Sequence, residues 1–522
     1  IGMFQVESRA QMSCLPRLRP QRFYDIVVEV AIIRPGPIVG QMVNPYLQRR
    51  QGREAVTYPH PSLEPVLART LGVPLFQEQL LRMAMIAAGF SGGEAEELRR
   101  AMGFKRSQAR MREIEQRLRA GMTRNRIAPE AQEQIVQSIT SFALYGFPES
   151  HAASFALLAY ASAYLKCHYL AAFTAALLNH QPMGFYSPAT LVKDAQRHGL
   201  RLLPIDVTRS EWLCTLEHPP QRHGDTEKNK EEMEPSVPLC LCGEKDFAVR
   251  LGLGYARGLR EEGARALLAE RARAAFTSID DLARRVPELR RNELVLLAEI
   301  GALNSVASSQ SPVASEFPVP SSRFPENERL PSVAGEDQPG TENRKLRTRF
   351  HRRDALWQVE RAVRRPGPLL RGLPEDGAVS PLAPMRDQER LVADFRGTGL
   401  TTGPHPMAYQ RARLDALGVR RACDLGRLPQ GRRVRVAGCV IARQRPGSAR
   451  GFVFLSLEDE TGIANAILTP DVFTQNRFTV VSESFLLIEG ALQNQDGVIS
   501  VKAARVLPLA VTRAPTRSHD FH

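Results

Sequence analysis

The interval between apolar residues changes at Gly431, and this change restricts the folds open to the chain. Through residues 1–210, apolar side chains recur at intervals of three and four, as they do in amphipathic helices. After Gly431 the interval is two: Val434, Val436 and Val440 alternate with arginine and other side chains, which is typical of half-buried strands. The sequence therefore predicts a mostly helical region followed by a region of strands.

Five short strands are expected after Gly431, with a strong hairpin signal at Asp496-Gly497. Five strands within about 75 residues fit an OB-type barrel. Barrels of this class often bind single-stranded nucleic acid through basic and aromatic faces. In the alternative interpretation, the phenylalanines belong to the core and the arginines form a solvated rim. The candidates for nucleic-acid binding are Arg435, Arg443, Arg445, Arg450, Phe452 and Phe454.

The stretch LRRAMGFKR, residues 98–106, gathers four cations around one predicted turn at Gly103. Arginine offers forked donors and lysine a mobile point charge, so a triphosphate matches this group. The alternative is a solvated basic helix end, because cations also suit the dipole at the C-terminus of a helix. The four cations are Arg99, Arg100, Lys105 and Arg106.

Two further motifs lie at predicted helix starts. Ser150 is expected to cap a long helix, with His151 in its first turn as either a capping residue or a substrate contact. The run from Gly258 to Gly263, which includes Arg260, resembles a helix-hairpin-helix turn whose amides hold a DNA phosphate. Because its glycines are more widely spaced than usual, a small helical bundle is the alternative.

Composition points to a polyanionic partner. Lys and Arg number 70 against 56 Asp and Glu, giving a net charge of +14, which favours nucleic acid; a ribosomal or membrane-surface protein would share this balance. The seven cysteines are scattered and odd in number, which indicates reduced thiols in a cytoplasmic protein. Since the apolar run Ala152–Leu165 is shorter than the ~20 residues of a membrane span, no membrane is expected.

Several N-terminal segments recur in the order and spacing of one family. They are FQVESR (Phe4–Arg9), RPGP (Arg34–Pro37), FQEQ (Phe76–Gln79), RRAMG (Arg99–Gly103) and YGFPESHAASFALLAY (Tyr145–Tyr160). Together they resemble the bacterial C-family DNA polymerases, the alpha subunit of DNA polymerase III. The resemblance is highly specific over residues 1–215 and weaker through 249–303 and the barrel. C-terminal segments such as VRVAGCVIARQRPG resemble the error-prone, damage-inducible branch, which works in mutagenic repair synthesis.

The resemblance implies a multidomain fold class: mostly helical fingers and a helix-hairpin-helix region, then a C-terminal β-barrel of OB type. Two polar segments, Glu217–Lys245 and Asn304–Arg349, are predicted to be disordered. The expected parts are the end of the palm and entry to the fingers (1–50), fingers (51–215), a disordered insertion (216–248), a helix-hairpin-helix or clamp-binding region (249–303), a disordered linker (304–350), a helical connector (351–430), the OB-fold domain (431–509) and a tail (510–522).

In the family, paired arginines and a following lysine of the fingers contact the triphosphate. The resemblance therefore implies that Arg99, Arg100 and Lys105 bind the incoming nucleotide, and that His151 and Ser154 line its pocket. It implies a DNA primer-template and deoxynucleoside triphosphates as partners. A sliding clamp and mutagenesis accessory proteins are further candidates.

The metal site is where the chain departs from the family pattern. Polymerase chemistry needs carboxylates that hold two Mg²⁺ ions, and the family takes them from an Asp-x-Asp strand and a third Asp upstream of FQVESR. The chain begins with Ile1, so it is expected to be the C-terminal half of a longer error-prone DNA-directed DNA polymerase and inactive alone. The alternative is a non-catalytic DNA-binding or scaffolding fragment.

Overall fold

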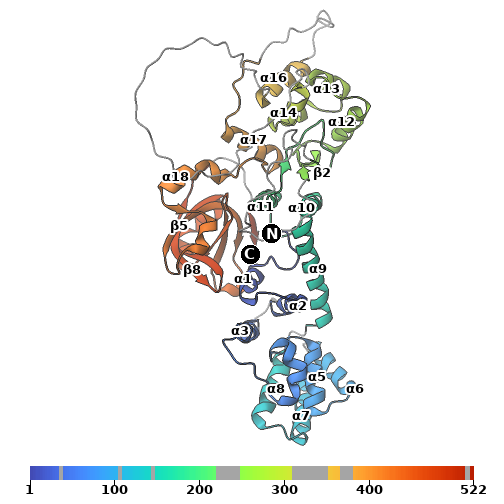
Figure 1. Cartoon of the computed structure of the whole chain (residues 1–522), viewed down its shortest axis with the longest axis vertical. Coiled ribbons are helices and arrows are strands. Elements are labelled where there is room, and N and C mark those ends of the chain that lie inside the picture. Colours follow the sequence, from blue (N-terminus) through green and yellow to red (C-terminus); the bar gives the residue numbers. More distant parts are fainter. Residues whose placement is uncertain are drawn as a thin grey trace, which may run out of the picture. The chain divides into compact units, whose positions relative to one another are not determined.

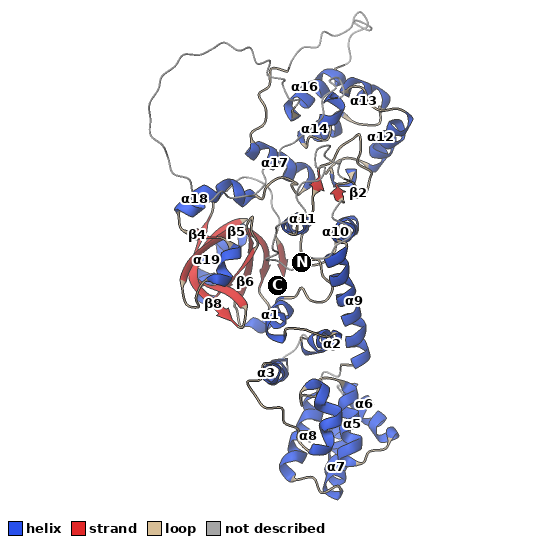
Figure 2. Ribbon diagram, viewed as in Figure 1, coloured by secondary structure: helices blue, strands red, loops and turns tan. Residues whose placement is uncertain are grey.

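The computed structural model describes residues 1–33, 39–103, 108–142, 147–218, 247–308, 351–364, 380–511 and 518–521. Two compact units make up the chain (Figure 1). The first consists of Ile1–Leu202, Leu216–Val249 and Leu400–His522, and the second of Leu203–Thr215 and Arg250–Gly399. Helices form most of the second unit and the N-terminal part of the first, whereas strands are concentrated in the C-terminal part (Figure 2).

The N-terminal helices of the first unit share one core with a long helix, α9. A capping box starts α1: Ser8 Oγ accepts from the Gln11 amide, and Gln11 Oε1 accepts from the Ser8 amide. The apolar run before Arg34 is the helix α2, which packs against α9. The helices that contribute to this core are α1 (Arg9–Leu18), α2 (Phe23–Ile32), α3 (Val39–Arg50) and α9 (Glu149–His168). They are followed by α10 (Leu170–Asn179) and α11 (Pro188–Arg197).

A helical bundle, α5–α8, has a core of its own in the first unit (Figure 1). Leu80, Leu98, Leu118 and Ile135 bring one fully buried side chain each from α5, α6, α7 and α8. Burying such a side chain contributes roughly 1.5–3 kcal/mol. The elements are η1 (Pro61–Leu63), α4 (Glu64–Leu67), η2 (Ala68–Thr70), α5 (Gln77–Ala88), α6 (Gly92–Gly103), α7 (Gln108–Arg124) and α8 (Pro129–Phe142).

Short helices packed on one another form the second unit. Glu293, which is 1% exposed, accepts from the Arg290 and Arg260 amides and so ties the starts of two helices together. Three short strands, β1 (Leu202–Leu203), β3 (Ala248–Arg250) and β2 (Thr215–Glu217), form a small sheet in that order, and the residues of each strand are divided between the two units. The helices are η3 (Leu253–Tyr255), α12 (Glu261–Arg273), α13 (Ile279–Arg285), α14 (Arg291–Glu299), α15 (Asn304–Ser308), α16 (Arg352–Val363) and α17 (Asp387–Thr398).

A closed five-stranded barrel forms the C-terminal part of the first unit, which confirms the predicted fold class. β5 pairs with both β6 and β8, and β7 pairs in parallel with β9. With the β6–β7 and β8–β9 pairs, these pairings close the five strands into a ring. Gly438 and Gly490 lie so close to a neighbouring backbone that no larger residue fits. The strands are β4 (Val419–Arg420), β5 (Arg433–Gln444), β6 (Val453–Glu458), β7 (Ile463–Leu468), β8 (Phe485–Gln495), β9 (Val498–Pro508) and β10 (His519–Phe521).

The barrel is joined to the N-terminal helices by one buried and one exposed ion pair. Arg197 on α11 donates to Glu458 at the end of β6 over 2.8 Å, and the Glu458 side chain is 4% exposed. Arg53 forms an ion pair with Asp496 in the β8–β9 turn. The remaining helices near the barrel are η5 (Pro406–Gln410), α18 (Arg411–Ala416), η6 (Ala422–Arg427), η7 (Gly447–Ala449) and α19 (Pro470–Ser482).

Some predicted elements differ from the observed ones. The N-cap of α9 is Pro148 rather than Ser150, because the backbone is already helical at Glu149. The strand predicted from Leu202 stops after two residues, at the residue before Pro204, which cannot donate to a ladder. The predicted linker begins with the short helix α15. Lys105, Arg106 and most of both predicted disordered segments lie outside the described residues.

Candidate nucleotide and nucleic-acid interface

The paired arginines lie on the exposed face of α6. Leu98 is fully buried in the bundle core, so the next two side chains turn outward, and Arg99 and Arg100 are 48% and 74% exposed. Both donate to Glu96, from Arg99 over 2.7 Å and from Arg100 over 3.1 Å. Hydrogen bonds from the two guanidinium groups lower the pKa of Glu96 to about 2. Exposed pairs of this kind contribute little stability, so a more highly charged anion can displace Glu96.

His151 and Ser154 lie on the exposed surface of α9, near its N-terminus. The His151 ring packs between Phe147 and Phe155, with ring centroids 5.1 and 4.3 Å away. Ser154 Oγ donates to the Ser150 carbonyl over 3.0 Å. Among the described residues, no hydrogen bond or ion pair joins these two side chains to the paired arginines of α6.

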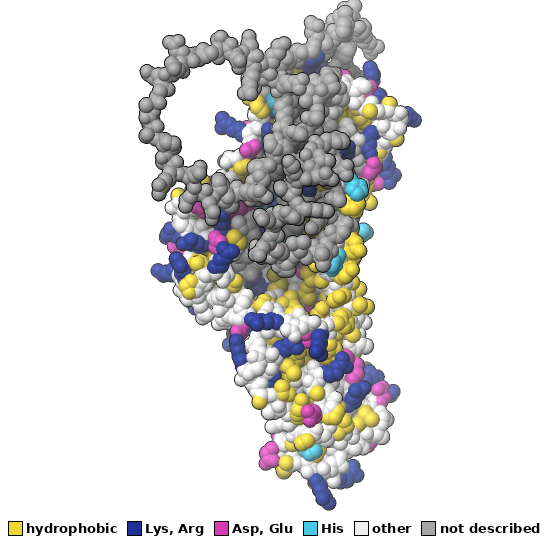
Figure 3. All heavy atoms as spheres, in the orientation of Figure 1, with side chains coloured by type: hydrophobic (Ala, Val, Ile, Leu, Met, Phe, Trp, Pro, Cys, Tyr) yellow, Lys and Arg dark blue, Asp and Glu magenta, His cyan; other side chains and the backbone are white. Residues whose placement is uncertain are grey.

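The same helix carries a run of exposed apolar side chains (Figure 3). Leu157 is 59% exposed and Leu158 52% exposed, and they follow Ser154 at helical intervals of three and four. A contiguous apolar surface of this kind usually marks an interaction site. Its larger members on α9 are Leu157, Leu158, Tyr160, Tyr164 and Leu165, and the exposed Tyr169 follows directly after the helix.

Arg260 and Gly258 lie in the turn before α12. Gly258 has φ +99° and open space around its Cα, which suits a close backbone approach. The Arg260 guanidinium, however, donates to both carboxylate oxygens of Glu293, and its amide donates to the same group. Because Glu293 is buried, it needs this cation, so Arg260 is engaged within its own unit.

The basic residues predicted on the barrel have different partners. Arg435 pairs with Glu489 over 2.7 Å, and the Arg445 guanidinium lies 5.1 Å from the centre of the Phe473 ring. Arg443, 13% exposed, donates to the Val480 and Glu483 carbonyls at the end of α19. Arg443 is therefore held as part of the barrel's structure. Arg450, in a left-handed turn with φ +48°, is exposed, and Phe452 is half-buried.

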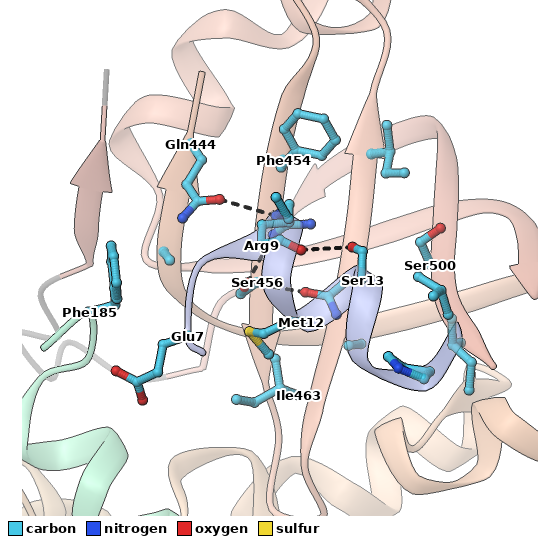
Figure 4. A pocket seen from close by; sticks show the side chains of 18 of the residues that line it. Glu7, Arg9, Met12, Ser13, Phe185, Gln444, Phe454, Ser456, Ile463 and Ser500 are labelled. Carbon is cyan, nitrogen blue, oxygen red and sulfur yellow. Dashed lines mark hydrogen bonds between the residues drawn. The ribbon is translucent and has the colours of Figure 1, made fainter. Parts of the chain in front are cut away.

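A cavity of about 600 Å³ lies where α1 meets the barrel (Figure 4). Arg9 extends from α1 into it, and its Nε donates to Gln444 over 3.2 Å. Its Nη2 donates to Ser456 over 3.1 Å, and the guanidinium lies 5.0 Å from the centre of the Phe454 ring. Burial lowers the pKa of Arg9 to about 10. Phe454 is thus the predicted barrel residue that this cavity contains.

Sequence reasoning missed the contribution of α1 to this cavity. In the sequence, Arg9 is only the last residue of the segment FQVESR, and no motif marks Gln444 or Ser456 as its partners. Arg9 is separated from Gln444 by 435 positions. No local pattern links residues so far apart, because their contact depends on how the barrel packs against the N-terminal helices.

Acidic side chains of the barrel and of the N-terminal helices have structural partners. Asp459 accepts from the Thr461 and Gly462 amides, which is the chemistry of a turn. Asp25 pairs with Arg50 over 2.7 Å. Within the described ranges, no three His, Cys, Asp or Glu side chains are grouped so that they could hold a metal ion. The described side chains therefore form no site that fits Mg²⁺.

Glu29 on α2 is a buried carboxylate. Both of its oxygens are buried, and neither accepts a hydrogen bond from any residue that the structure describes. Desolvation raises the pKa of Glu29 to about 8, so the group is mostly protonated at neutral pH. In the part of the chain that the structure describes, no helix is long and apolar enough to cross a membrane.

Family models match three parts of the chain. A model for the bacterial DNA polymerase III alpha subunit finger domain matches residues 1–126. A helix-hairpin-helix motif matches residues 199–312, and an OB-fold nucleic acid binding domain matches residues 434–509. The third match coincides with the closed barrel, and the second includes the turn that contains Gly258.

Curated relatives align with the whole chain. The error-prone DNA polymerase of Anaeromyxobacter sp. strain K is 46% identical over 100% of this chain, which covers 41% of that relative. The error-prone DNA polymerase of Alkalilimnicola ehrlichii is 42% identical, and error-prone DNA polymerase 3 of Agrobacterium fabrum is 40% identical. The chain covers 45% and 43% of these two, so it spans less than half of the length of each.

Proposed function

The chain belongs to the bacterial C-family DNA polymerases, of the DNA polymerase III alpha-subunit type, and we propose that it supplies the nucleotide-binding fingers and DNA-binding parts of an error-prone polymerase. One observation carries the proposal: proteins named error-prone DNA polymerase are 40–46% identical to the chain over 98–100% of its length. The reaction is DNA-directed transfer of nucleotides to a primer. Its role is synthesis across damaged template during damage-induced mutagenesis, in the cytoplasm.

In this proposal, the exposed surface of α6 binds the triphosphate. Arg99 and Arg100 exchange Glu96 for phosphate oxygens, and Lys105 adds a third cation. His151 and Ser154 line the nucleotide pocket from α9. The side chains of Arg99, Arg100, His151 and Ser154 are all exposed, which is consistent with these roles. The expected boundaries of the fingers, helix-hairpin-helix and OB domains remain part of the proposal.

The metal ions of this reaction are proposed to bind outside these 522 residues. Mg²⁺ would be held by palm carboxylates of a longer protein, since the described residues offer no group that fits it. A DNA primer-template and deoxynucleoside triphosphates are the proposed substrates, and a sliding clamp and mutagenesis accessory proteins the proposed partners.

Primer extension tests this function. The coding sequence upstream of Ile1 is joined to the chain, and the longer protein is given Mg²⁺, nucleotides and a primed template with or without an abasic site. We expect extension on both templates by the longer protein and none by the 522-residue chain.

Two results would contradict the proposal. Incorporation by a pure preparation of the 522-residue chain would mean that its own carboxylates hold the metal ions. A longer protein that binds primed DNA yet adds no nucleotide would identify a DNA-binding scaffold instead.

A further inference from the structure

The cavity beside Arg9 lies on the face of the barrel that OB folds use for ligands. In such barrels, oligonucleotides bind across strands two and three and the neighbouring loops. Here strands two and three are β6 and β7, and both line the cavity together with the β5–β6 loop and the β8–β9 turn. The opposite wall is α1, through Arg9, Met12, Ser13 and Pro16. This face is therefore shared between the barrel and the N-terminal segment.

Arg9 enters the cavity without an anionic partner. Its guanidinium donates to the amide oxygen of Gln444 and the hydroxyl of Ser456, which are both neutral (Figure 4). Of the lining residues, all of which the structure describes, Glu7 is the one that carries a carboxylate. That carboxylate accepts from the Gly2 and Met3 amides and points away from Arg9 in Figure 4. A largely buried cation with only neutral acceptors favours an incoming anion.

The other side chains in the cavity suit a nucleobase. Phe454 offers an aromatic ring on which a base can stack, and stacking of this kind contributes about 1–3 kcal/mol per base. Gln444, Ser456 and Asn465 border the same space with donors and acceptors for a base edge. A volume of about 600 Å³ lies within the range of small-molecule sites, roughly 300–1,000 Å³.

We propose that this cavity binds one nucleotide of a single-stranded nucleic acid, with a phosphate on Arg9 and the base on Phe454. Arg9 exchanges its neutral acceptors for the phosphate and leaves the Phe454 ring to the base. The inference rests on the proposed function, in which the barrel binds single strands, and adds that α1 provides the phosphate-binding residue. The N-terminal segment and the barrel thus form one strand-binding site.

Binding of a fluorescent oligothymidylate to the full 522-residue chain, followed by anisotropy at several salt concentrations, tests this site. The Arg9→Gln variant should bind at least ten-fold more weakly. Its slope of log affinity against log salt should fall by about 0.7, the value for one phosphate of a single strand. Arg9→Lys should keep the slope and recover part of the affinity, because lysine keeps the charge without the fork.

Two further variants complete the design. Phe454→Leu should weaken binding roughly 5–150-fold, which corresponds to one stacked base, with the salt slope unchanged. Arg119→Gln removes one cation from α7, where Arg119 pairs with Glu115 and Glu133, and should bind like the wild type. Melting curves of all variants establish whether each is folded. If Arg9→Gln is not folded, the affinity of Arg9→Lys relative to the wild type tests the role of Arg9.

The outcomes separate this inference from the proposed function. Unchanged binding by the Arg9 and Phe454 variants, with a wild type that binds, overturns the cavity alone. Tighter binding by Arg9→Gln also overturns it, because α1 would then compete with the strand for the barrel. A wild-type chain that binds no oligonucleotide contradicts both the cavity and the strand-binding role of the barrel. Primer extension by the longer protein tests the polymerase function separately.

Discussion

At the scale of single residues, the exposed arginines of α6 carry the proposed triphosphate contact. In the longer polymerase, Arg99→Ala would leave a phosphate charge without its forked donor, which typically costs about 2–3 kcal/mol. We therefore expect kcat/KM for the nucleotide to fall about 30–150-fold, with affinity for primed template unchanged. Steady-state extension at varied nucleotide concentration measures both quantities.

Matched variants distinguish a triphosphate contact from loss of charge in general. Arg119→Ala removes an arginine that pairs with Glu115 one helical turn away, as Arg100 pairs with Glu96, and should keep wild-type kinetics. Arg100→Lys should recover only part of the activity lost in Arg100→Ala. Wild-type nucleotide dependence in both alanine variants of α6 would mean that the two arginines form an ordinary solvated helix surface.

Glu29 makes the stability of the first unit depend on pH. Its folded-state pKa of about 8 lies above the ordinary value of 4.5, so the folded chain binds more protons than the unfolded chain between these values. Stability contributed by this group therefore falls as pH rises from about 4.5 to about 8. Glu29→Gln removes the titration, and we expect its melting temperature relative to wild type to rise steadily over that range.

The size and control of this effect follow from the same numbers. The free energy of unfolding contributed by Glu29 should change by on the order of 1.4 kcal/mol per pH unit within this range, which amounts to a few kcal/mol at its high-pH end. Glu133→Gln, at an exposed position with 65% of the side chain accessible, should retain the wild-type pH dependence. A difference between Glu29→Gln and wild type that is constant from pH 5 to pH 8.5 would contradict a buried, protonated Glu29.

At the scale of elements, Gly121 allows α5 and α7 to approach closely. A Cβ at this position would lie 2.1 Å from the Ala88 carbonyl oxygen at the end of α5, so the helices would have to separate. Gly121→Ala should destabilise the bundle by about 1–3 kcal/mol. Hydrogen exchange of the α5 and α7 amides, measured by mass spectrometry, should become faster in this variant.

A second glycine provides the control. Gly93, in the first turn of α6, has open space around it, so Gly93→Ala should stabilise the helix by roughly 0.5 kcal/mol. Exchange in α5 and α7 should then be unchanged or slower. Equal exchange rates in the two variants would mean that helix propensity, rather than close packing, governs Gly121.

The predictability of each element follows from its local pattern. The strands of the barrel were predicted because apolar residues alternate through Val434 and Val436, and Asp496-Gly497 marks a hairpin. Helix α19 was not predicted, since Pro470–Ser482 is rich in phenylalanine, valine and threonine, which have little preference for helices. Its N-terminal proline and its packing against β9 favour the helix instead.

The candidate site residues divide in the same way. Arg99 and Phe454 could be chosen from sequence, because cations beside a turn and aromatic residues in a strand have local signatures. The internal partners of Arg260 and Arg443 could not, since Glu293 and Glu483 lie 33 and 40 positions away. Arg9 gave no signal as a barrel contact for the same reason.

At the scale of the whole molecule, the count of 70 Lys and Arg residues overstates the number of cations available to a nucleic acid. Arg197, Arg260 and Arg443 are each bound to a carboxylate or to backbone carbonyls. Only cations without such partners, or with weak exposed ones, can exchange for phosphates. The salt dependence of binding should therefore correspond to a few phosphates rather than to the full number of cations.

The full chain and a single-stranded oligothymidylate test this expectation. If four phosphates are neutralised, raising monovalent salt from 50 to 200 mM should weaken binding about 50-fold, because each phosphate contributes about 0.7 to the slope. A peptide nucleic acid of the same sequence has no phosphates and should bind weakly at both salt concentrations. A salt response close to zero for the DNA would contradict binding through charge, and equal affinities for the two oligomers would assign recognition to the bases alone.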